Sequence, residues 1–254
     1  MWNSSFGRQV LAACCLAAVL VSCAAPASAQ EKPVTVRARI ELPAPAKSEK
    51  SRSQGIDASE VVVWLMPLDH PAEKNVPADQ SAKRLQVVQK NKSFQPHLTV
   101  ARVGTMVDFP NRDPFFHNVF SLFDGKRFDL GLYEAGATNS VRFDHPGVSF
   151  LFCNIHPEMS AVVVAVDTPY YGISDKSGGV TIANVPDGRY ELHVWYERSL
   201  PEELKRLTRT VHISQDSRDL GAIVVRQDAD FSPTHKNKYG QDYPPAPKEG
   251  YPRP

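Results

Sequence analysis

Short segments in which apolar and polar residues alternate, or in which a brief apolar run occurs, recur along the chain after residue 33. A period of two predicts β-strands, and no window shows the sustained period of 3.6 that predicts a helix. Gly, Pro or Asn separates most of the segments, and closely spaced short strands are typical of a β-sandwich or barrel. We therefore expect an all-β protein with strands at 34–42, 60–68, 118–123, 140–144, 148–153 and 161–167, and two strand-like pieces within 98–109 that are separated by a turn at Gly104.

A second series of strands follows residue 167. The Pro-Asp-Gly segment 186–188 predicts a tight turn between two of them, because Pro presets φ and Gly accepts positive φ. The same series predicts strands at 207–215 and 219–227. The pattern thus predicts two β-sandwiches, at 30–167 and 168–227.

Two other segments differ from this pattern. Residues 199–207, SLPEELKRL, predict one or two helical turns with Ser199 as the N-cap. The Pro-rich tail 228–254 has no apolar periodicity, and we expect it to be disordered or extended.

The first 29 residues combine a single Arg, an apolar run and small residues, which is the pattern of a secretory signal. An A-x-A site before Gln30 indicates cleavage there, and the alternative is a lipobox that makes Cys23 a lipidated N-terminus. Either route exports the protein, so we expect it in the periplasm or anchored to a membrane as a lipoprotein. No later stretch is apolar enough to span a bilayer.

Charge and cysteine content narrow the function classes. The whole chain has a net charge of +1, and removal of the signal with Arg8 leaves a neutral protein, without the basic bias of a nucleic-acid binder. Three of the four cysteines lie in the signal region, so Cys153 is the one thiol left after cleavage at residue 29. A lone thiol in an oxidising compartment is either held, for example by a metal, or buried and inert.

The segment FLFCNIHPEMSA, residues 150–161, suggests which of these applies. Cys153, His156 and Met159 follow one another at intervals of three, directly after a predicted strand. Thiolate, imidazole and thioether are soft ligands that favour copper. The alternative is a strand end with three unrelated side chains, in which Met159 fills the core.

His117 is the best candidate for a fourth ligand, because it lies where a polar loop becomes an apolar strand. Two histidines and a cysteine in a plane, with a methionine on the axis, form a blue-copper site. The rival interpretations are a structural histidine at a strand end and a Cys/His nucleophile pair, which would need a cleft and an orienting Asn or Asp. Phe115 and Phe116 form either an apolar rim at this site or core plugs.

These motifs resemble the cupredoxin family over about residues 84–167. CNIHPEM resembles the short ligand loop of amicyanin, and HNVFS and HPGVSFLFC resemble segments of plastocyanins. The resemblance implies a cupredoxin Greek-key β-sandwich with one type 1 copper ion. It also implies that Asn118 hydrogen-bonds across to the cysteine loop and holds the two ligand segments together. The implied ligands are His117, Cys153, His156 and Met159.

The segment from Ser174 to Glu197 resembles the carboxypeptidase-regulatory, transthyretin-like β-sandwich, with Val180 where an aromatic residue is usual. The combination is similar to cupredoxin-containing proteins of the type labelled methylamine-utilisation proteins. Strands 34–42 and 60–68 belong either to the cupredoxin sandwich or to this second one. In the latter case the copper domain is inserted into the second sandwich.

The motifs favour a one-electron carrier that is not an enzyme. We expect electrons to leave through the ring edge of His156, at an apolar docking surface near Pro157, Phe115 and Phe116. The expected partner is a redox protein such as a c-type cytochrome or a periplasmic dehydrogenase, which docks weakly over a small area. The alternatives are copper storage, delivery or sensing without electron transfer, and a surface or adhesion module.

Overall fold

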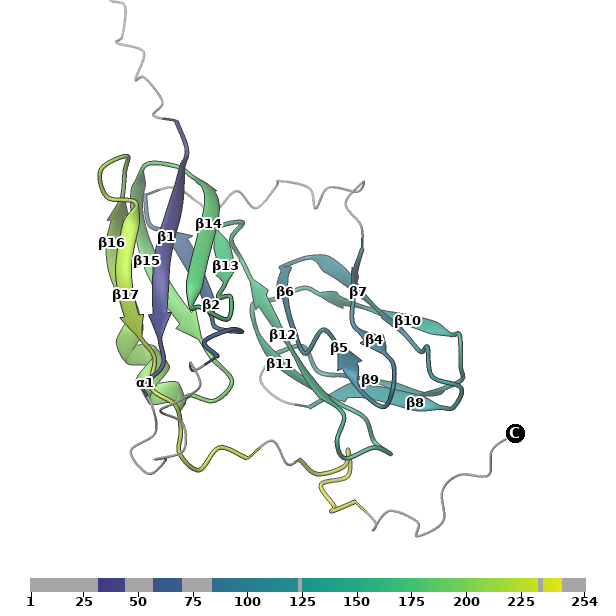
Figure 1. The fold of residues 1–254 in the computed structure, drawn as a ribbon. Helices are drawn as coiled ribbons and strands as arrows, with labels where there is room; N and C mark the ends of the chain where they lie inside the picture. The colour runs from purple at the N-terminus through teal and green to yellow at the C-terminus, as the bar shows by residue number, and fades with distance from the viewer. Residues whose placement is uncertain (1–31, 44–56, 70–83, 123–124, 233–234, 244–254) are drawn as a thin grey trace, which may run out of the picture. The chain divides into compact units, whose positions relative to one another are not determined.

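The computed structural model describes residues 32–43, 57–69, 84–122, 125–232 and 235–243 (Figure 1). The expected signal segment, with Cys23, lies outside these residues. The described part of the chain is almost entirely β-structure, so the predicted all-β class is confirmed. Its strands form two sandwiches, each with its own buried core.

The first sandwich, called here the flanking sandwich, is built from two sheets of antiparallel and parallel strands. One sheet has the order β14-β1-β17, with β14 at Gly179–Val185, β1 at Val34–Glu41 and β17 at Asp219–Val224. The other has the order β13-β2-β15-β16, with the bounds Tyr171–Ile173, Val62–Pro67, Gly188–Trp195 and Arg209–Ile213.

Strand β1 shows why this sandwich forms, since its residues alternate strictly between buried and exposed. One face therefore enters the core while the other meets water, as the period of two requires. The core includes the fully or almost fully buried side chains Val36, Ile40, Leu65, Ile182, Leu192 and Ile213.

Strand pairing corrects the expected domain boundary at residue 30. β1 pairs with β14 and β17, and β2 pairs with β13 and β15, so both strands belong to the flanking sandwich. The preference of sequential strands to be neighbours misled the boundary prediction, because the exposed edges of β1 and β2 are completed by strands from much later in the chain. The second sandwich is inserted between β2 and β13, which was the alternative.

The inserted sandwich contains a five-stranded sheet with the order β6-β12-β11-β8-β9. These strands span Leu98–Arg102, Ser160–Val166, Gly147–Phe152, His117–Ser121 and Phe128–Tyr133. Facing it is the sheet β10-β7-β3, at Thr138–Phe143, Thr105–Pro110 and Leu85–Gln86, with a small hairpin of β4 at Val88–Gln89 and β5 at Phe94–Gln95.

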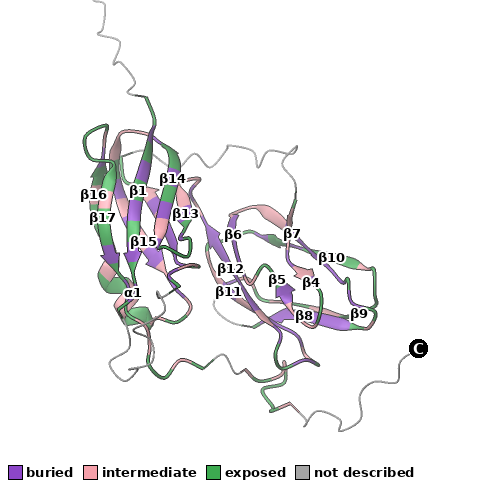
Figure 2. Cartoon of the chain, in the orientation of Figure 1, coloured by how far each residue is buried: buried purple, intermediate pink, exposed green. Residues whose placement is uncertain are grey.

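Strand β11 is buried or half-buried along its whole length, as expected for an apolar strand inside a sandwich (Figure 2). Leu151 and the following Cys153 lie in the core of the inserted sandwich, where both are fully buried. Phe150 is on the opposite face and packs against a separate apolar cluster that includes Val162 and Trp195. The chain therefore leaves β11 with the thiol directed into the core.

The helix α1, Pro201–Leu207, is the helical turn expected near this position. Its cap differs from the expectation: the N-cap residue is Leu200, and the hydroxyl of Ser199 donates to the carbonyl of Arg226 instead. Pro201 at the first helical position supplies the start signal. Within the described ranges, no helix is long and apolar enough to cross a membrane.

Candidate metal centre

The candidate ligands come from two strands that the five-stranded sheet brings together. β8 begins at His117, and β11 ends one residue before Cys153. The two strands are neighbours, with Phe120 opposite Phe152. Sheet pairing thus places the start of one strand beside the end of the other, and the two ligand segments meet there.

The loop after β11 folds back on itself through two backbone hydrogen bonds. The N–H of Met159 donates to the carbonyl of His156 at 3.1 Å, and the N–H of Cys153 donates to the carbonyl of Met159 at 3.3 Å. The sequence therefore forms a closed turn, which brings Sγ of Cys153 within 3.6 Å of Nδ1 of His156.

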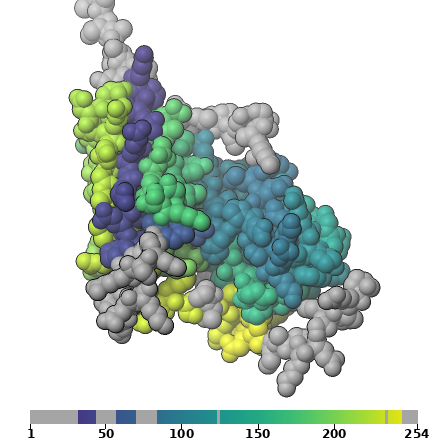
Figure 3. Space-filling view, viewed as in Figure 1, coloured from purple at the N-terminus to yellow at the C-terminus, as the bar shows by residue number. Residues whose placement is uncertain are grey.

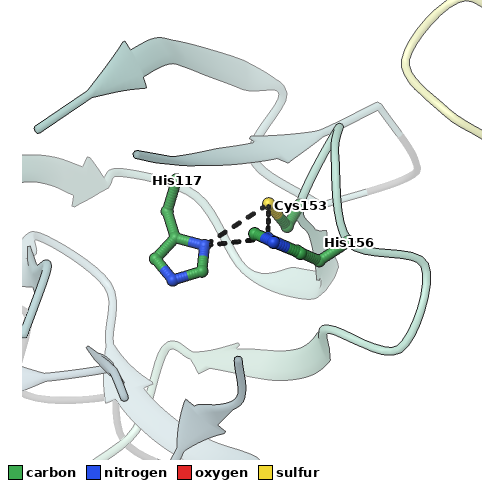
Figure 4. A group of neighbouring side chains, drawn as sticks. All are labelled: His117, Cys153 and His156. Carbon is green, nitrogen blue, oxygen red and sulfur yellow. Dashed lines mark hydrogen bonds between the residues drawn. The ribbon is translucent and has the colours of Figure 1, made fainter. Parts of the chain in front are cut away.

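Three donor atoms converge at this point (Figure 4). The Cys153 Sγ atom lies 3.8 Å from Nδ1 of His117 and 3.6 Å from Nδ1 of His156, and the two Nδ1 atoms are 3.1 Å apart. Metal–ligand bonds of about 2.0–2.3 Å would separate the donors of a trigonal site by roughly 3.5–3.8 Å. The group thus has the size of a metal site, and its donors are those that suit copper.

Met159 is the fourth predicted ligand. Its side chain is fully buried and belongs to the same core cluster as Cys153. It lies in the loop that carries two of the three converging donors, Cys153 and His156, and would hold a metal there together with them.

The surroundings of Cys153 act on its thiol in opposite directions. Burial raises the pKa of the Cys153 thiol above its ordinary value. The backbone N–H groups of Asn118, Ile155 and His156 face the sulfur and favour the thiolate, which lowers the pKa in part. The N–H donors that would stabilise a metal-bound thiolate are therefore already in place around a buried thiol.

Asp113 holds the imidazole of His117 from the opposite side. Its Oδ2 atom lies 2.8 Å from Nε2 of His117, and both side chains are buried. A proton on Nε2 is donated to the carboxylate, which leaves Nδ1 of His117 unprotonated and directed at Cys153 and His156. A carboxylate on the remote nitrogen of a ligand histidine fixes its tautomer and raises its basicity.

The Asp113 carboxylate is itself held by a backbone turn. Asn91 and Lys92 have φ of 56° and 52°, in the left-handed region, and their N–H groups donate to Oδ1 and Oδ2 of Asp113 at 2.6 and 2.9 Å. Burial acts to raise the pKa of Asp113, but these two N–H groups and His117 lower it overall. The ionised carboxylate is thus stabilised next to the ligand.

Asn118 has different partners from those expected. Its side-chain amide donates at 2.8 Å to Oδ1 of Asp129 and to the carbonyl of Gly131, both in β9, and not to the cysteine loop. The link to the cysteine loop is made by the backbone N–H of Asn118, which faces the Cys153 thiol. Asn118 therefore joins three segments, through its main chain on one side and its side chain on the other.

The ring of His156, through whose edge we expected electrons to leave, is buried in the structure. Only 4% of His156 is exposed, and its Nε2 atom is buried without a hydrogen-bond partner among the described residues. Phe115 packs against both ligand rings, with centroids 5.1 Å from His117 and 5.7 Å from His156. Phe115 therefore covers the imidazoles, whereas Phe116, 54% exposed, and Pro157 lie on the surface.

Sequence reasoning missed Asp113 and the loop that positions it. Asn111 accepts a hydrogen bond from the N–H of Asp113 and donates to the carbonyl of Phe115, so it shapes the segment before His117. Such turns by Asn are a local sequence signal. A carboxylate four residues before a proposed ligand histidine was visible in the sequence, and could have been tested as its partner.

Comparisons with known proteins find partial structural likeness. No protein-family model and no curated protein matches the chain. The Cu-containing nitrite reductase (NirK) from Thermus scotoductus SA-01 is 24% identical, with a TM-score of 0.32, over 33% of this chain and 22% of that one. This chain therefore spans about a fifth of that reductase's length.

Two smaller solved structures match this chain over most of their own length. The novel purple cupredoxin from Nitrosopumilus maritimus is 23% identical, with a TM-score of 0.30, over 32% of this chain and 99% of that one. An oxidised mutant of amicyanin is 20% identical, with a TM-score of 0.31, over 35% of this chain and 88% of that one. At these identities and scores the metal centre has to be inferred from the ligand geometry of this chain.

Proposed function

We propose that this protein binds one copper ion in a type 1 site and carries single electrons. The observation that supports the proposal is the convergence of three buried donor atoms, one sulfur and two imidazole nitrogens, within 4.8 Å of one another. Met159 would complete the ligand set of His117, Cys153 and His156. When bound, copper would supply one-electron chemistry by cycling between its Cu(I) and Cu(II) states.

The chain's own residues suit such a site. Asp113 orients His117, the backbone N–H groups around Cys153 favour the thiolate, and Phe115 shields the imidazole rings from water. A buried and hydrogen-bonded ligand set changes little between two oxidation states. Four protein ligands leave no coordination position for a substrate, and for that reason we propose a carrier and not an enzyme.

The proposed partner is a periplasmic redox protein such as a c-type cytochrome or a dehydrogenase. Exposed apolar residues are the immediate sequence neighbours of the ligands: Phe116 beside His117, and Ile155 and Pro157 on either side of His156. A small apolar surface of this kind suits a weak and transient encounter. A periplasmic location is part of the proposal, and the signal-like pattern of the first 29 residues supports it.

The test is the absorption and electron paramagnetic resonance spectra of the copper-loaded protein. A cysteine thiolate bound to Cu(II) gives intense charge-transfer absorption in the red, and Cys153→Ser should abolish it while the protein remains folded. Phe115→Met is the control, because it keeps all four proposed ligands and should therefore keep the colour. A colourless protein that binds zinc in preference to copper would refute a type 1 site.

Copper storage or sensing is a second candidate, and the burial of His156 is the observation that favours it. Stopped-flow mixing of the reduced protein with an oxidised c-type cytochrome separates the two candidates. Electron transfer from the reduced protein to the cytochrome after mixing supports the electron-carrier function. A blue protein that exchanges no electrons, but whose copper passes to a chelator, supports storage or delivery.

A further inference from the structure

The C-terminal segment 235–243, yellow in Figure 3, lies against the inserted sandwich, and hydrogen bonds join it to the loop that carries Cys153. The hydroxyl of Tyr243 donates to the carbonyl oxygen of Cys153 at 2.7 Å, and the backbone N–H of Lys238 donates to the side-chain oxygen of Asn154 at 3.0 Å. The segment therefore hydrogen-bonds to both Cys153 and Asn154. It contains neither a helix nor a strand, and these contacts fix its position.

An aromatic layer strengthens this attachment. The ring of His235 stacks on Phe152, with centroids 4.1 Å apart and planes inclined by 25°. Tyr243 meets the same imidazole edge-on at 5.3 Å, and its hydroxyl lies 3.2 Å from Nδ1 of His235. Phe152 directly precedes Cys153, so the tail covers the outer face of the strand whose inner face carries the ligand.

The same segment also reaches the other ligand strand. Nζ of Lys238 lies 2.7 Å from Oδ2 of Asp129, and Oδ1 of Asp129 accepts the hydrogen bond from Asn118. Asn118 follows His117 directly in β8. One short piece of chain thus touches the cysteine loop directly and the histidine strand through β9.

We propose that Tyr243 and His235 are positioning residues of the metal centre, and that segment 235–243 is a strap that holds the Cys153 loop against it. The inference rests on the proposed copper function, and it adds residues from outside both sandwiches to the site. None of the ligands comes from the strap, so its effect is on the position and surroundings of Cys153.

Two consequences follow from the geometry. A loop fixed at both ends of the Cys153–Asn154 peptide opens less often, so copper leaves slowly and the thiol is shielded from reagents. The hydroxyl of Tyr243 also directs the positive end of its dipole at the ligand residue, which stabilises the more negative, reduced site. Hydrogen bonding around the cysteine is a recognised means of setting the reduction potential.

The experiment compares Tyr243→Phe with Tyr239→Phe in the full chain. Tyr239 is 71% exposed, so the same loss of a hydroxyl four residues earlier is a matched control. We expect Tyr243→Phe to release copper to a chelator about tenfold faster, the upper end of the effect of one hydrogen bond. Its reduction potential should fall, and Tyr239→Phe should match the wild type in both measurements.

A metal-free measurement keeps the strap testable if copper loading fails. Alkylation of Cys153, followed by peptide mass spectrometry, should be several-fold faster in Tyr243→Phe and in His235→Ala than in wild type, at unchanged melting temperature. Equal rates of copper release and alkylation in Tyr243→Phe and Tyr239→Phe would overturn the strap. Absence of red absorption in the wild type would instead overturn the copper function and leave the alkylation result to decide the strap.

Discussion

Nε2 of His117 and Oδ2 of Asp113 lie 2.8 Å apart in a site where both side chains are buried. The carboxylate has little access to water there, so it depends on His117 and on the N–H groups of Asn91 and Lys92. This pairing orders His117, the proposed ligand, before any metal binds. It also places a full negative charge one imidazole ring away from the proposed metal position.

Asp113→Asn should therefore raise the reduction potential, because loss of the negative charge destabilises Cu(II) more than Cu(I). We expect a rise on the order of 50 mV, close to a tenfold change in a one-electron equilibrium. Copper affinity should fall about 10- to 100-fold, as for other partners of metal-binding histidines. Voltammetry and chelator competition measure the two effects.

Asp144→Asn is the control for this change, because Asp144 is a half-exposed carboxylate that pairs with Lys126 and His145. Loss of that charge should leave potential and affinity near the wild-type values. An unchanged potential in Asp113→Asn would show that the carboxylate does not act on the metal.

His97 and Glu197 should make stability depend on pH. Nε2 of His97 lies 2.6 Å from Oε2 of Glu197, and this hydrogen bond raises the pKa of His97 although burial opposes it. A raised folded-state pKa means that protonated His97 stabilises the fold. That stabilisation is complete below the unfolded pKa of about 6.5 and is lost as pH rises through the folded-state value.

The measurement is urea unfolding between about pH 5 and pH 9. The free energy of unfolding of the wild type should decline relative to that of His97→Gln as pH rises through this range. The free energy of unfolding of the wild type should decline in the same way relative to that of Glu197→Gln, because either substitution removes the pair. Parallel pH profiles in all three proteins would contradict the assignment to this pair.

Leu192→Ala should destabilise the flanking sandwich by about 2–5 kcal/mol, since Leu192 is fully buried in its core and truncation leaves a cavity. Leu200→Ala is the matched control, because Leu200 is 47% exposed and should change stability by no more than about 0.5 kcal/mol. Denaturant unfolding compares the two. Similar free energies of unfolding for Leu192→Ala and Leu200→Ala would contradict the packing of Leu192 in the core.

Gly178→Ala should cost more than Gly104→Ala. Both glycines have positive φ, 83° and 92°, which an alanine adopts at a cost of about 1–2 kcal/mol. At residue 178 an added Cβ would also overlap the carbonyl oxygen of Ile40, whereas nothing lies within 4 Å of the corresponding position at residue 104. Thermal unfolding of the two variants separates backbone strain from steric overlap, and a smaller loss at residue 178 would contradict the close approach.

The period-two pattern predicted the class and most strands because a half-buried strand must alternate, as β1 does. Strand β9, Phe128–Tyr133, was missed. Its burial does not alternate cleanly and Gly131 interrupts it at a φ of 69°. The spacing of Cys153, His156 and Met159 likewise predicted a loop in which side chains converge, and the backbone hydrogen bonds of that loop explain why local sequence was sufficient.

Local pattern therefore determined most of the strands, the ligand loop and the choice of His117 as its partner across the sheet. Only the tertiary structure decided that β1 and β2 complete the flanking sandwich, that Phe115 covers the imidazoles, and that the C-terminal segment binds the Cys153 loop. The physical reason is the range of the interactions. Periodicity and turns act between residues a few positions apart, whereas strand pairing, ring contacts and the Tyr243 hydrogen bond join residues whose separation along the chain leaves no mark on local sequence.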